Sequence, residues 1–578
     1  MRTALVATSL AMVLVVGCNR ASESSTASTP VAAAGVESTA PAPKLPADAP
    51  WANDPAALRI SRDVAILADD KMEGRETGTR GYALASDHVA KRYAEIGLRP
   101  AGDDGGFFQQ VPLLQSTRQR EGARFEVARN GRSIALRFQD QFLPQADFDA
   151  SSSEVTAPAV FVGQGVHAPG LEHDDYAGLD LHGKIAVLFN GAPASFDNDR
   201  RAFYSSRREK LRELVARGAV GAVFVSTAED EARSPWERGA MDWDRPSMRL
   251  RGEDGSAIDS FPALKVVAAV SAAAADLVFA DSDKSAAELF AAASKGELKG
   301  FALPGTLTLA SRSHIVLAES RNVVGLLPGS DASLANEYVV YTAHLDHIGI
   351  GKPVKGDSIN NGALDNALGV AIMLEAAQQL VDGKALPKRS QLFVAVTGEE
   401  KGLLGAEWFA SHPTVPREAL VANINMDMPV LMAPTTDVVP IGVEHSSLKA
   451  ALDDAAKDVG VALSPDPFPE ESVFIRSDQY AFIRAGIPAV YLTGGVIPAD
   501  KTNVRDPKLA LRFFLRNCYH QPCDDATSQP IQYGDAVRLA RLNARIGQLV
   551  GDAPQRPTWN TGDFFGERFG AQQGKRQP

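Results

Sequence analysis

The chain has 578 residues, of which 45% are hydrophobic and 22% charged. This composition is that of a globular protein with a sizeable core, and the length exceeds that of one ordinary domain. Without the first 17 residues it has 58 basic and 71 acidic residues, a net charge of −13. Such an acidic balance argues against a nucleic-acid partner, which would require basic surfaces.

The first 17 residues are typical of an export signal. Arg2 precedes a short apolar run over residues 4–16, and Cys18 follows directly after Val-Val-Gly. A run of this length is a signal-peptide core rather than a membrane span. The sequence Val-Val-Gly-Cys resembles a bacterial lipobox, which implies that Cys18 is lipidated. We therefore expect an exported protein, anchored to the bacterial cell envelope on the periplasmic side of the outer membrane. The alternative is a plain secretory signal with an accidental cysteine.

Residues 18–52 contain mainly Ser, Thr, Ala and Pro, so we expect a flexible tether there. The C-terminal tail, residues 553–578, is similar but contains several aromatic residues. We expect part of the tail to pack onto a domain through these side chains, which are Trp559, Phe564, Phe565 and Phe569.

The remaining chain divides into three segments. Residues 53–150 begin with apolar positions at helical spacing over 55–100 and continue with strand-like alternation over 107–143. Residues 151–305 form a distinct block of apolar strands and helices. In residues 306–552, short apolar runs alternate with helical stretches, which predicts an α/β domain with a mostly parallel mixed sheet flanked by helices.

Acidic residues and histidines follow the predicted strands of this last segment. Each has an ordinary explanation by itself, but carboxylates and imidazoles gathered at one sheet edge would require cations. Imidazole and carboxylate ligands suit zinc, and a pair of metal ions activates water against a carbonyl group. The residues are His344, Asp346, Asp365, Glu399, Glu400, Asp427 and His520.

The motifs around these residues resemble the co-catalytic zinc aminopeptidases of metallopeptidase family twenty-eight, of the secreted bacterial leucine aminopeptidase type. The stretches that carry the resemblance are residues 344–346, 362–366, 398–405, 425–427 and 519–520, together with Met72-Glu73-Gly74-Arg75 near the N-terminus. The resemblance implies a zinc-peptidase, phosphorylase/hydrolase-like fold over 53–150 and 306–552. It also implies two zinc ions and hydrolysis of the N-terminal peptide bond of peptide substrates.

The resemblance also implies a role for each site residue. Asp365 would bridge the two zinc ions, with His344 and Asp427 completing one site and Glu400 and His520 the other. Glu399 would be the general base on a bridging hydroxide or water. Asp346 would orient His344 from outside the ligand set, and Tyr519 would hydrogen-bond the oxyanion or simply pack beside His520.

Other nearby residues have less specific interpretations. We assign His347 and His445 structural roles. Asp524 would either buttress His520 or cap a turn, and Arg476 would face the substrate or the surface. Cys518 and Cys523 flank His520, and in an exported chain we expect them to form a disulfide.

Residues 151–305 resemble an inserted protease-associated domain, a β-rich α+β module, through the stretches 175–185 and 217–222. Residues 226–260 depart from that pattern and remain unassigned.

Three alternatives remain open for the function. A carboxypeptidase of the glutamate carboxypeptidase type would need a basic pocket, for which only Arg476 and Arg484 are available. A glutaminyl cyclase-like acyl transferase would need one zinc ion. A non-enzymatic relative like the transferrin receptor would have lost its ligands, which are all retained here. Neither a HExxH nor a GxSxG motif is present.

Overall fold

A mixed β-sheet, here called the first sheet, forms the centre of the computed structural model, which describes residues 51–499 and 506–572. Cys18, the signal peptide and nearly all of the predicted tether therefore lie outside the described residues. In spatial order the strands of the first sheet are β11 (Ser247–Leu250), β2 (Phe108–Arg118), β13 (Phe301–Leu327), β17 (Ser390–Val396), β14 (Tyr338–His344), β18 (Leu420–Asn425), β21 (Ala489–Gly494), β19 (Asp437–Ile441) and β20 (Ala462–Leu463). The short β1 (Arg99–Pro100) pairs with the end of β13.

Four adjacent strands in the middle of this sheet, β17, β14, β18 and β21, are parallel, and antiparallel strands flank them on both sides. The prediction of a mixed sheet flanked by helices is therefore confirmed, but parallel pairing predominates only in the middle of the sheet. Because parallel strands point the same way, the carboxyl ends of these four strands lie at one edge of the sheet.

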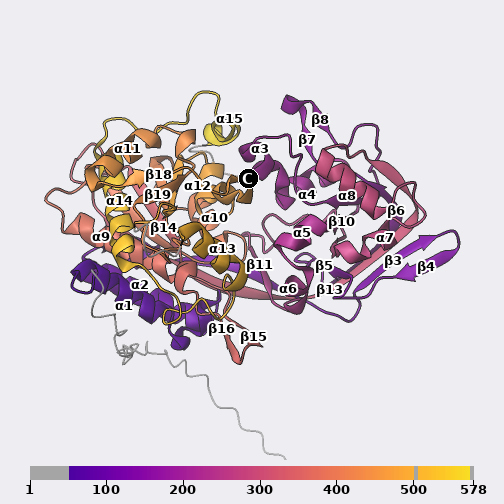
Figure 1. The fold of residues 1–578 in the computed structure, drawn as a ribbon, viewed down its shortest axis with the longest axis horizontal. Coiled ribbons are helices and arrows are strands. Elements are labelled where there is room, and N and C mark those ends of the chain that lie inside the picture. The colour runs from indigo at the N-terminus through magenta and orange to yellow at the C-terminus, as the bar shows by residue number, and fades with distance from the viewer. Residues whose placement is uncertain (1–50, 500–505, 573–578) are drawn as a thin grey trace, which may run out of the picture. The chain divides into compact units, whose positions relative to one another are not determined.

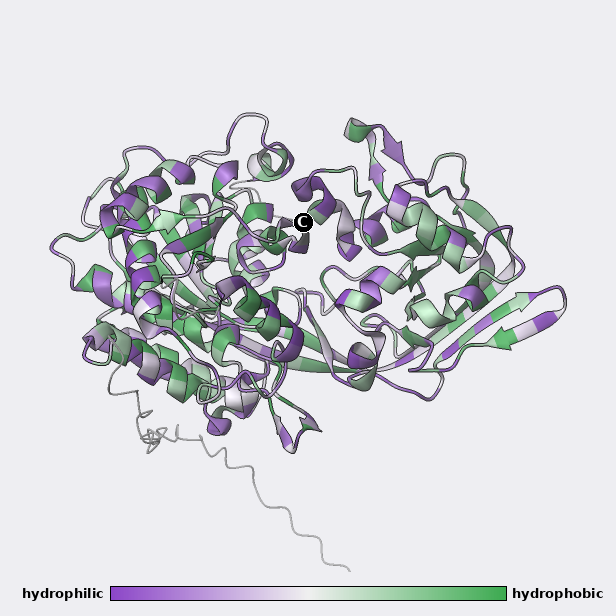
Figure 2. Ribbon diagram, in the orientation of Figure 1, coloured by the Kyte–Doolittle hydropathy of each residue, from purple (hydrophilic) through white to green (hydrophobic). Residues whose placement is uncertain are grey.

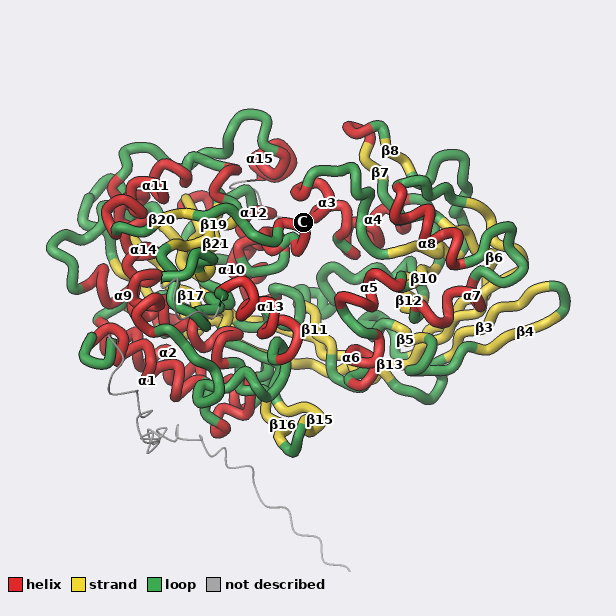
Figure 3. The backbone as a smooth tube through the Cα atoms, in the orientation of Figure 1, coloured by secondary structure: helices red, strands yellow, loops and turns green. Residues whose placement is uncertain are grey.

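Helices cover both faces of the first sheet because its central strands are apolar on both sides (Figure 3). The residues of β14 alternate between the two faces, with Tyr341 in one hydrophobic cluster and Val340 in the other. One face packs against α1 (Pro55–Leu67), α2 (Arg80–Ile96), α9 (Leu368–Val381), α11 (Leu448–Val459) and α14 (Tyr533–Asp552). The other packs against α10 (Leu404–Ser411) and α12 (Gln479–Arg484).

The N-terminal helices form where the sequence predicts them. Asp54 caps α1 by accepting a hydrogen bond from Ala56 N at 2.8 Å, and Thr79 caps α2. Gly97, with φ of 95°, ends α2 in the left-handed conformation. Both helices are amphipathic, with hydrophobic and hydrophilic residues on opposite sides (Figure 2).

The long strand β13 continues from the first sheet into a second one (Figure 1). In spatial order this second sheet contains β4 (Arg132–Ala135), β3 (Arg124–Arg129), β13, β6 (Ser152–Phe161), β9 (Ile185–Phe189), β10 (Gly221–Val225), β12 (Val266–Val270) and β5 (Phe142–Pro144). Its associated helices are α3 (Asn198–Ser205), α4 (Arg207–Ala216), α5 (Ala228–Arg233), α6 (Trp236–Met241), α7 (Ala275–Val278) and α8 (Ala286–Lys295).

The structure places the boundary between the two sheets differently from the sequence prediction of 151–305. Residues 124–144, assigned from the sequence to the peptidase domain, contribute β3, β4 and β5 to the second sheet. Conversely, β11 lies within the predicted insert but pairs with β2 of the first sheet. Strand alternation predicts that a segment is extended, but not which sheet it joins, because pairing partners are distant in sequence.

The C-terminal tail packs onto the domain, as its aromatic residues predict. Phe565 and Phe569 of α15 (Phe564–Phe569) are buried against Phe203 of α3 and Tyr480 of α12. The indole nitrogen of Trp559 donates to Gly486 O at 2.9 Å. Among the described residues, no helix has the length and apolarity needed to cross a membrane.

Candidate metal centre

The carboxyl ends of three adjacent parallel strands bring most of the predicted ligands together. His344 is the last residue of β14, Glu399 and Glu400 follow β17, and Asp427 follows β18. Asp365 lies in the turn before α9, and His520 lies after α13 (Pro507–Asn517). The sequence prediction placed these groups at one sheet edge, and the structure places them there.

The donor atoms form two groups that share Asp365. In the first group, Nε2 of His344 lies 2.9 Å from Oδ1 of Asp427 and 3.3 Å from Oδ1 of Asp365. In the second, Nε2 of His520 lies 3.0 Å from Oε2 of Glu400 and 3.3 Å from Oδ2 of Asp365. The two oxygens of one carboxylate therefore face different groups, as expected of a bridging ligand.

His347 also belongs to the second group, although the sequence analysis assigned it a structural role. Its Nδ1 lies 2.9 Å from Oε1 of Glu400 and 3.7 Å from Oδ2 of Asp365, and its side chain is fully buried. The only sequence signal for it is its position three residues after His344. His445, the other histidine assigned a structural role, pairs instead with Asp563 of the C-terminal tail at 2.6 Å.

The donor set fits zinc. An ion that binds tetrahedral ligands at ~2.0–2.1 Å holds the ligand atoms roughly 3.3 Å from one another, and the histidine–carboxylate separations given above are 2.9–3.7 Å. Oδ2 of Asp365 and Nε2 of His520 are buried and make no hydrogen bond, although they lie 3.3 Å apart. Buried polar atoms without partners are costly, and a cation between them would satisfy both.

Asp346 reaches the site through different contacts from those predicted. The contact with His344 runs through the main-chain oxygen of Asp346, 3.1 Å from His344 Nδ1. The carboxylate of Asp346 accepts hydrogen bonds from the amides of Glu399 and Glu400 at 3.1 and 3.3 Å, and from the Thr77 hydroxyl at 2.9 Å. Asp346 thus links the turn after β14 to the turn after β17.

Glu399 is half-buried and interacts electrostatically with His344 and Asp427 of the first group and with Glu400 of the second. Its removal from bulk water raises the pKa of its carboxyl well above the ordinary value, and the nearby charges of Glu400 and Asp427 add to this effect. Divalent cations in the two groups would oppose these charges. A carboxyl group whose pKa is shifted in this way by its surroundings is suited to take up and release a proton.

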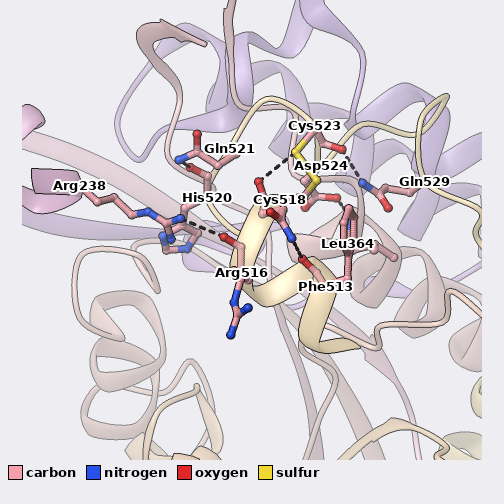
Figure 4. The surroundings of a disulfide bond; sticks show 11 residues. Arg238, Leu364, Phe513, Arg516, Cys518, His520, Gln521, Cys523, Asp524 and Gln529 are labelled. Carbon is pink, nitrogen blue, oxygen red and sulfur yellow. Dashed lines mark hydrogen bonds between the residues drawn. A yellow bond between two sulfur atoms is a disulfide. The ribbon is translucent and has the colours of Figure 1, made fainter. Parts of the chain in front are cut away.

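The loop after α13 holds His520 in place. Cys518 and Cys523 form the predicted disulfide, with their Cα atoms 5.1 Å apart (Figure 4). Within the loop, His520 has a φ of 57°, and the Tyr519 ring stacks on the His520 ring with centroids 3.8 Å apart. The side chain of His520 is 30% exposed, so the site is open to solvent on this side.

The carboxylate of Asp524 hydrogen-bonds to the turn that contains Asp365 rather than to His520, so it caps a turn, which was the second of the two predicted roles. One of its carboxylate oxygens accepts a hydrogen bond from the Leu364 amide at 2.8 Å (Figure 4), and the other accepts one from the Asp365 amide at 3.0 Å. Arg476, the candidate substrate-facing residue, binds the main-chain and side-chain oxygens of Glu471.

Comparison with known proteins agrees with this site. Residues 322–546, which include every proposed ligand, match the family model described as Peptidase family M28. These residues form a peptidase family M28 domain.

The chain is also similar to proteins named as an aminopeptidase and a probable zinc metalloprotease. A 232-residue stretch, 39% of this chain, is 28% identical to aminopeptidase Y of Saccharomyces cerevisiae, and a 106-residue stretch, 18% of the chain, is 37% identical to a probable zinc metalloprotease of Pyrenophora teres f. teres. The matched stretches span only 38% and 22% of those proteins. The chain also resembles the solved structure of an aminopeptidase from Aneurinibacillus sp., with a TM-score of 0.51, 17% identity, and coverage of 86% of this chain and 95% of that one. The similarity to the Aneurinibacillus structure supports the fold alone.

Proposed function

We propose that this protein is a zinc-dependent aminopeptidase that hydrolyses the N-terminal peptide bond of peptides with two zinc ions. The observation that carries the proposal is the Asp365 carboxylate, whose two oxygens face two separate groups of buried donors. When bound there, zinc would polarise the scissile carbonyl and make a water molecule acidic enough to act as the nucleophile.

The protein's own part in this reaction is proton transfer and positioning. Glu399 accepts the proton of the attacking water and delivers it to the leaving amine as the C–N bond breaks. The Asp346 carboxylate, which accepts a hydrogen bond from the Glu399 amide, holds the base beside the ligand groups. We further propose that Tyr519, stacked on His520, donates a hydrogen bond to the developing oxyanion.

The two rival enzymatic functions have less support. A carboxypeptidase needs a free cation for the substrate carboxylate, but Arg476 binds Glu471 and Arg484 forms an ion pair with Glu407. A single-zinc acyl transferase would not require the second donor group. The paired groups around Asp365 therefore favour the two-zinc aminopeptidase.

The test combines metal analysis with product analysis. We expect two zinc ions per chain and release of the first residue from a tripeptide with three different side chains. A free C-terminal residue as the first product would instead identify a carboxypeptidase, and a cyclised N-terminal glutamine would identify an acyl transferase.

We also propose a location and a role for the second sheet. Cys18 of the lipobox-like signal would anchor the exported protein to the outer membrane on its periplasmic side. The region around the second sheet would act as a protease-associated domain that limits which peptides reach the site. Phe569 contacts both Phe203 of α3 and Tyr480 of α12, which supports a fixed position for α3 beside the peptidase helices.

A further inference from the structure

Arg75 is a fully buried arginine whose hydrogen bonds all go to main-chain carbonyl groups among the described residues. Its Nε donates to Leu345 O at 2.8 Å, and its Nη1 donates to Leu67 O and Asn361 O, both at 2.6 Å. Its Nη2 donates to Gly362 O at 3.0 Å. A buried guanidinium is costly unless such partners and nearby negative charges compensate it.

Three of these acceptors lie beside proposed zinc ligands. Leu345 directly follows His344, and Asn361 and Gly362 precede Asp365 by four and three residues. One rigid guanidinium therefore sets the spacing between the loop that carries His344 and the loop that carries Asp365. Arginine is suited to this because its planar group presents five donors in a fixed geometry.

The backbone around Arg75 extends the same connection. The amide of His347 donates to Arg75 O at 3.1 Å, and the amide of Gly349 donates to Gly74 O at 2.9 Å. Gly74 has a φ of 64°, and a Cβ atom there would lie 2.5 Å from Asn360 O and 2.8 Å from Gly349 O. Only glycine allows this close approach, which brings Arg75 between the two loops.

Asp524 holds the Asp365 loop from its amide side. Its carboxylate accepts hydrogen bonds from Leu364 N and Asp365 N, while Arg75 donates to the carbonyls of Asn361 and Gly362. The loop is thus held at its carbonyls by the Arg75 guanidinium and at its amides by the Asp524 carboxyl group, and both side chains are fully buried. Burial lowers the pKa of Arg75 to about 10, which leaves it charged at neutral pH.

We infer that Arg75 is a positioning residue of the metal centre: it fixes the distance between the His344 and Asp365 loops and so determines how tightly zinc binds. This inference rests on the proposed zinc function. The ligands must be held within a fraction of an ångström for tight binding, and loss of residues that orient ligands typically costs ~10–100-fold in metal affinity.

The test measures zinc dissociation constants by competition with a chelator, using the full mature chain and the variants R75M and R75K. The matched control is R389M. Arg389 is 1% exposed and also donates to main chain, to Val550 O at 3.0 Å, but it lies at the start of β17, the end opposite the ligands. The melting temperature of each apo-protein measures how much the substitution destabilises the fold in the absence of zinc.

We expect R75M and R75K to weaken zinc binding about 10- to 100-fold, with R75K the milder because it retains the charge. R389M should lower the apo melting temperature but keep the zinc affinity. If R75K, or a folded R75M, binds zinc within about twofold of the wild type, Arg75 only supports the fold and the inference is wrong. If R75M does not fold, R75K decides. A wild-type protein that binds no zinc would instead refute the proposed function.

Discussion

Nδ1 of His347 lies 2.9 Å from Oε1 of Glu400, so a histidine that no sequence argument assigned to the site points into one of its two donor groups. With His347 included, the second group has four side chains and the first has three. The two groups therefore differ in the number of protein ligands that they offer to a metal ion.

We predict that H347Q weakens zinc binding at the second group and leaves the first group, which contains His344 and Asp427, near its wild-type affinity. Zinc titration followed by a chromogenic chelator should resolve one tight and one weakened ion. H445Q is the matched control, because His445 is similarly buried but pairs with Asp563. Two tightly bound ions in H347Q would show that His347 only packs beside the site.

Glu399 and Glu400 are neighbours in sequence but differ in their contacts, which allows a paired experiment. Only Glu400 lies within bonding distance of His347 and His520, so E400Q should lose the zinc ion of the second group. E399Q should retain both ions and lose about 10²–10⁴-fold in kcat, since general-base catalysis typically contributes that much. Zinc content and kcat on an aminoacyl chromogenic substrate are measured together. An E399Q enzyme with normal kcat would remove Glu399 from the mechanism.

The disulfide loop gives a prediction that separates site geometry from stability. The bridge between Cys518 and Cys523 closes a short loop, so removing it should return little entropy to the unfolded chain and lower the stability only slightly. His520 has a left-handed φ of 57° in this loop and should lose its position without the bridge. We expect the C518S/C523S variant to release zinc faster to a chelator, with a nearly unchanged apo melting temperature. Thiol titration of the denatured protein first verifies the bridge. Unchanged zinc release would show that the bridge does not position His520.

Lys210 of α4 should make stability depend on pH. Its ammonium group is buried, donates to Gly191 O at 2.7 Å, and has a pKa lowered to about 7 by burial. The unfolded chain therefore binds more protons than the native protein between pH 7 and the ordinary lysine pKa of about 10.4, and stability must rise with pH in that window.

From pH 7 to 9.5, the free energy of unfolding of the wild type should increase relative to K210M by on the order of 3 kcal/mol. Denaturant unfolding of the two apo-proteins at a series of pH values measures the difference. Parallel curves for the two proteins would mean that Lys210 is charged in the native state.

Cys18 lies outside the described residues, and its proposed lipidation has a simple test. In a Gram-negative host, the wild-type protein should fractionate with the outer membrane, because a lipid-modified cysteine supplies enough acyl chains for stable anchoring. C18A should be released or retained as an uncleaved precursor. Recovery of the wild type wholly in the soluble periplasm would contradict the lipobox interpretation.

Several features of the site follow from the sequence alone. His344, Glu400 and Asp427 each end or follow an apolar run with the pattern of a buried strand. Because helices alternate with these strands, a parallel sheet is expected, and its geometry brings the strand ends together. The disulfide was also predictable, since Cys518 and Cys523 are close in sequence and export to an oxidising compartment is the prediction for this chain.

Other features were decided only by the tertiary structure. Nothing local shows that His347 points toward Glu400, that the Asp346 carboxylate reaches the Glu399 amide, or that residues 124–144 join the second sheet. The Arg75 side chain contacts Leu345, which is 270 positions away. Local residue patterns specify which segments form strands and helices and where polar groups follow them. The direction of a loop side chain depends on partners from distant segments, and those partners are fixed only when the whole core has packed.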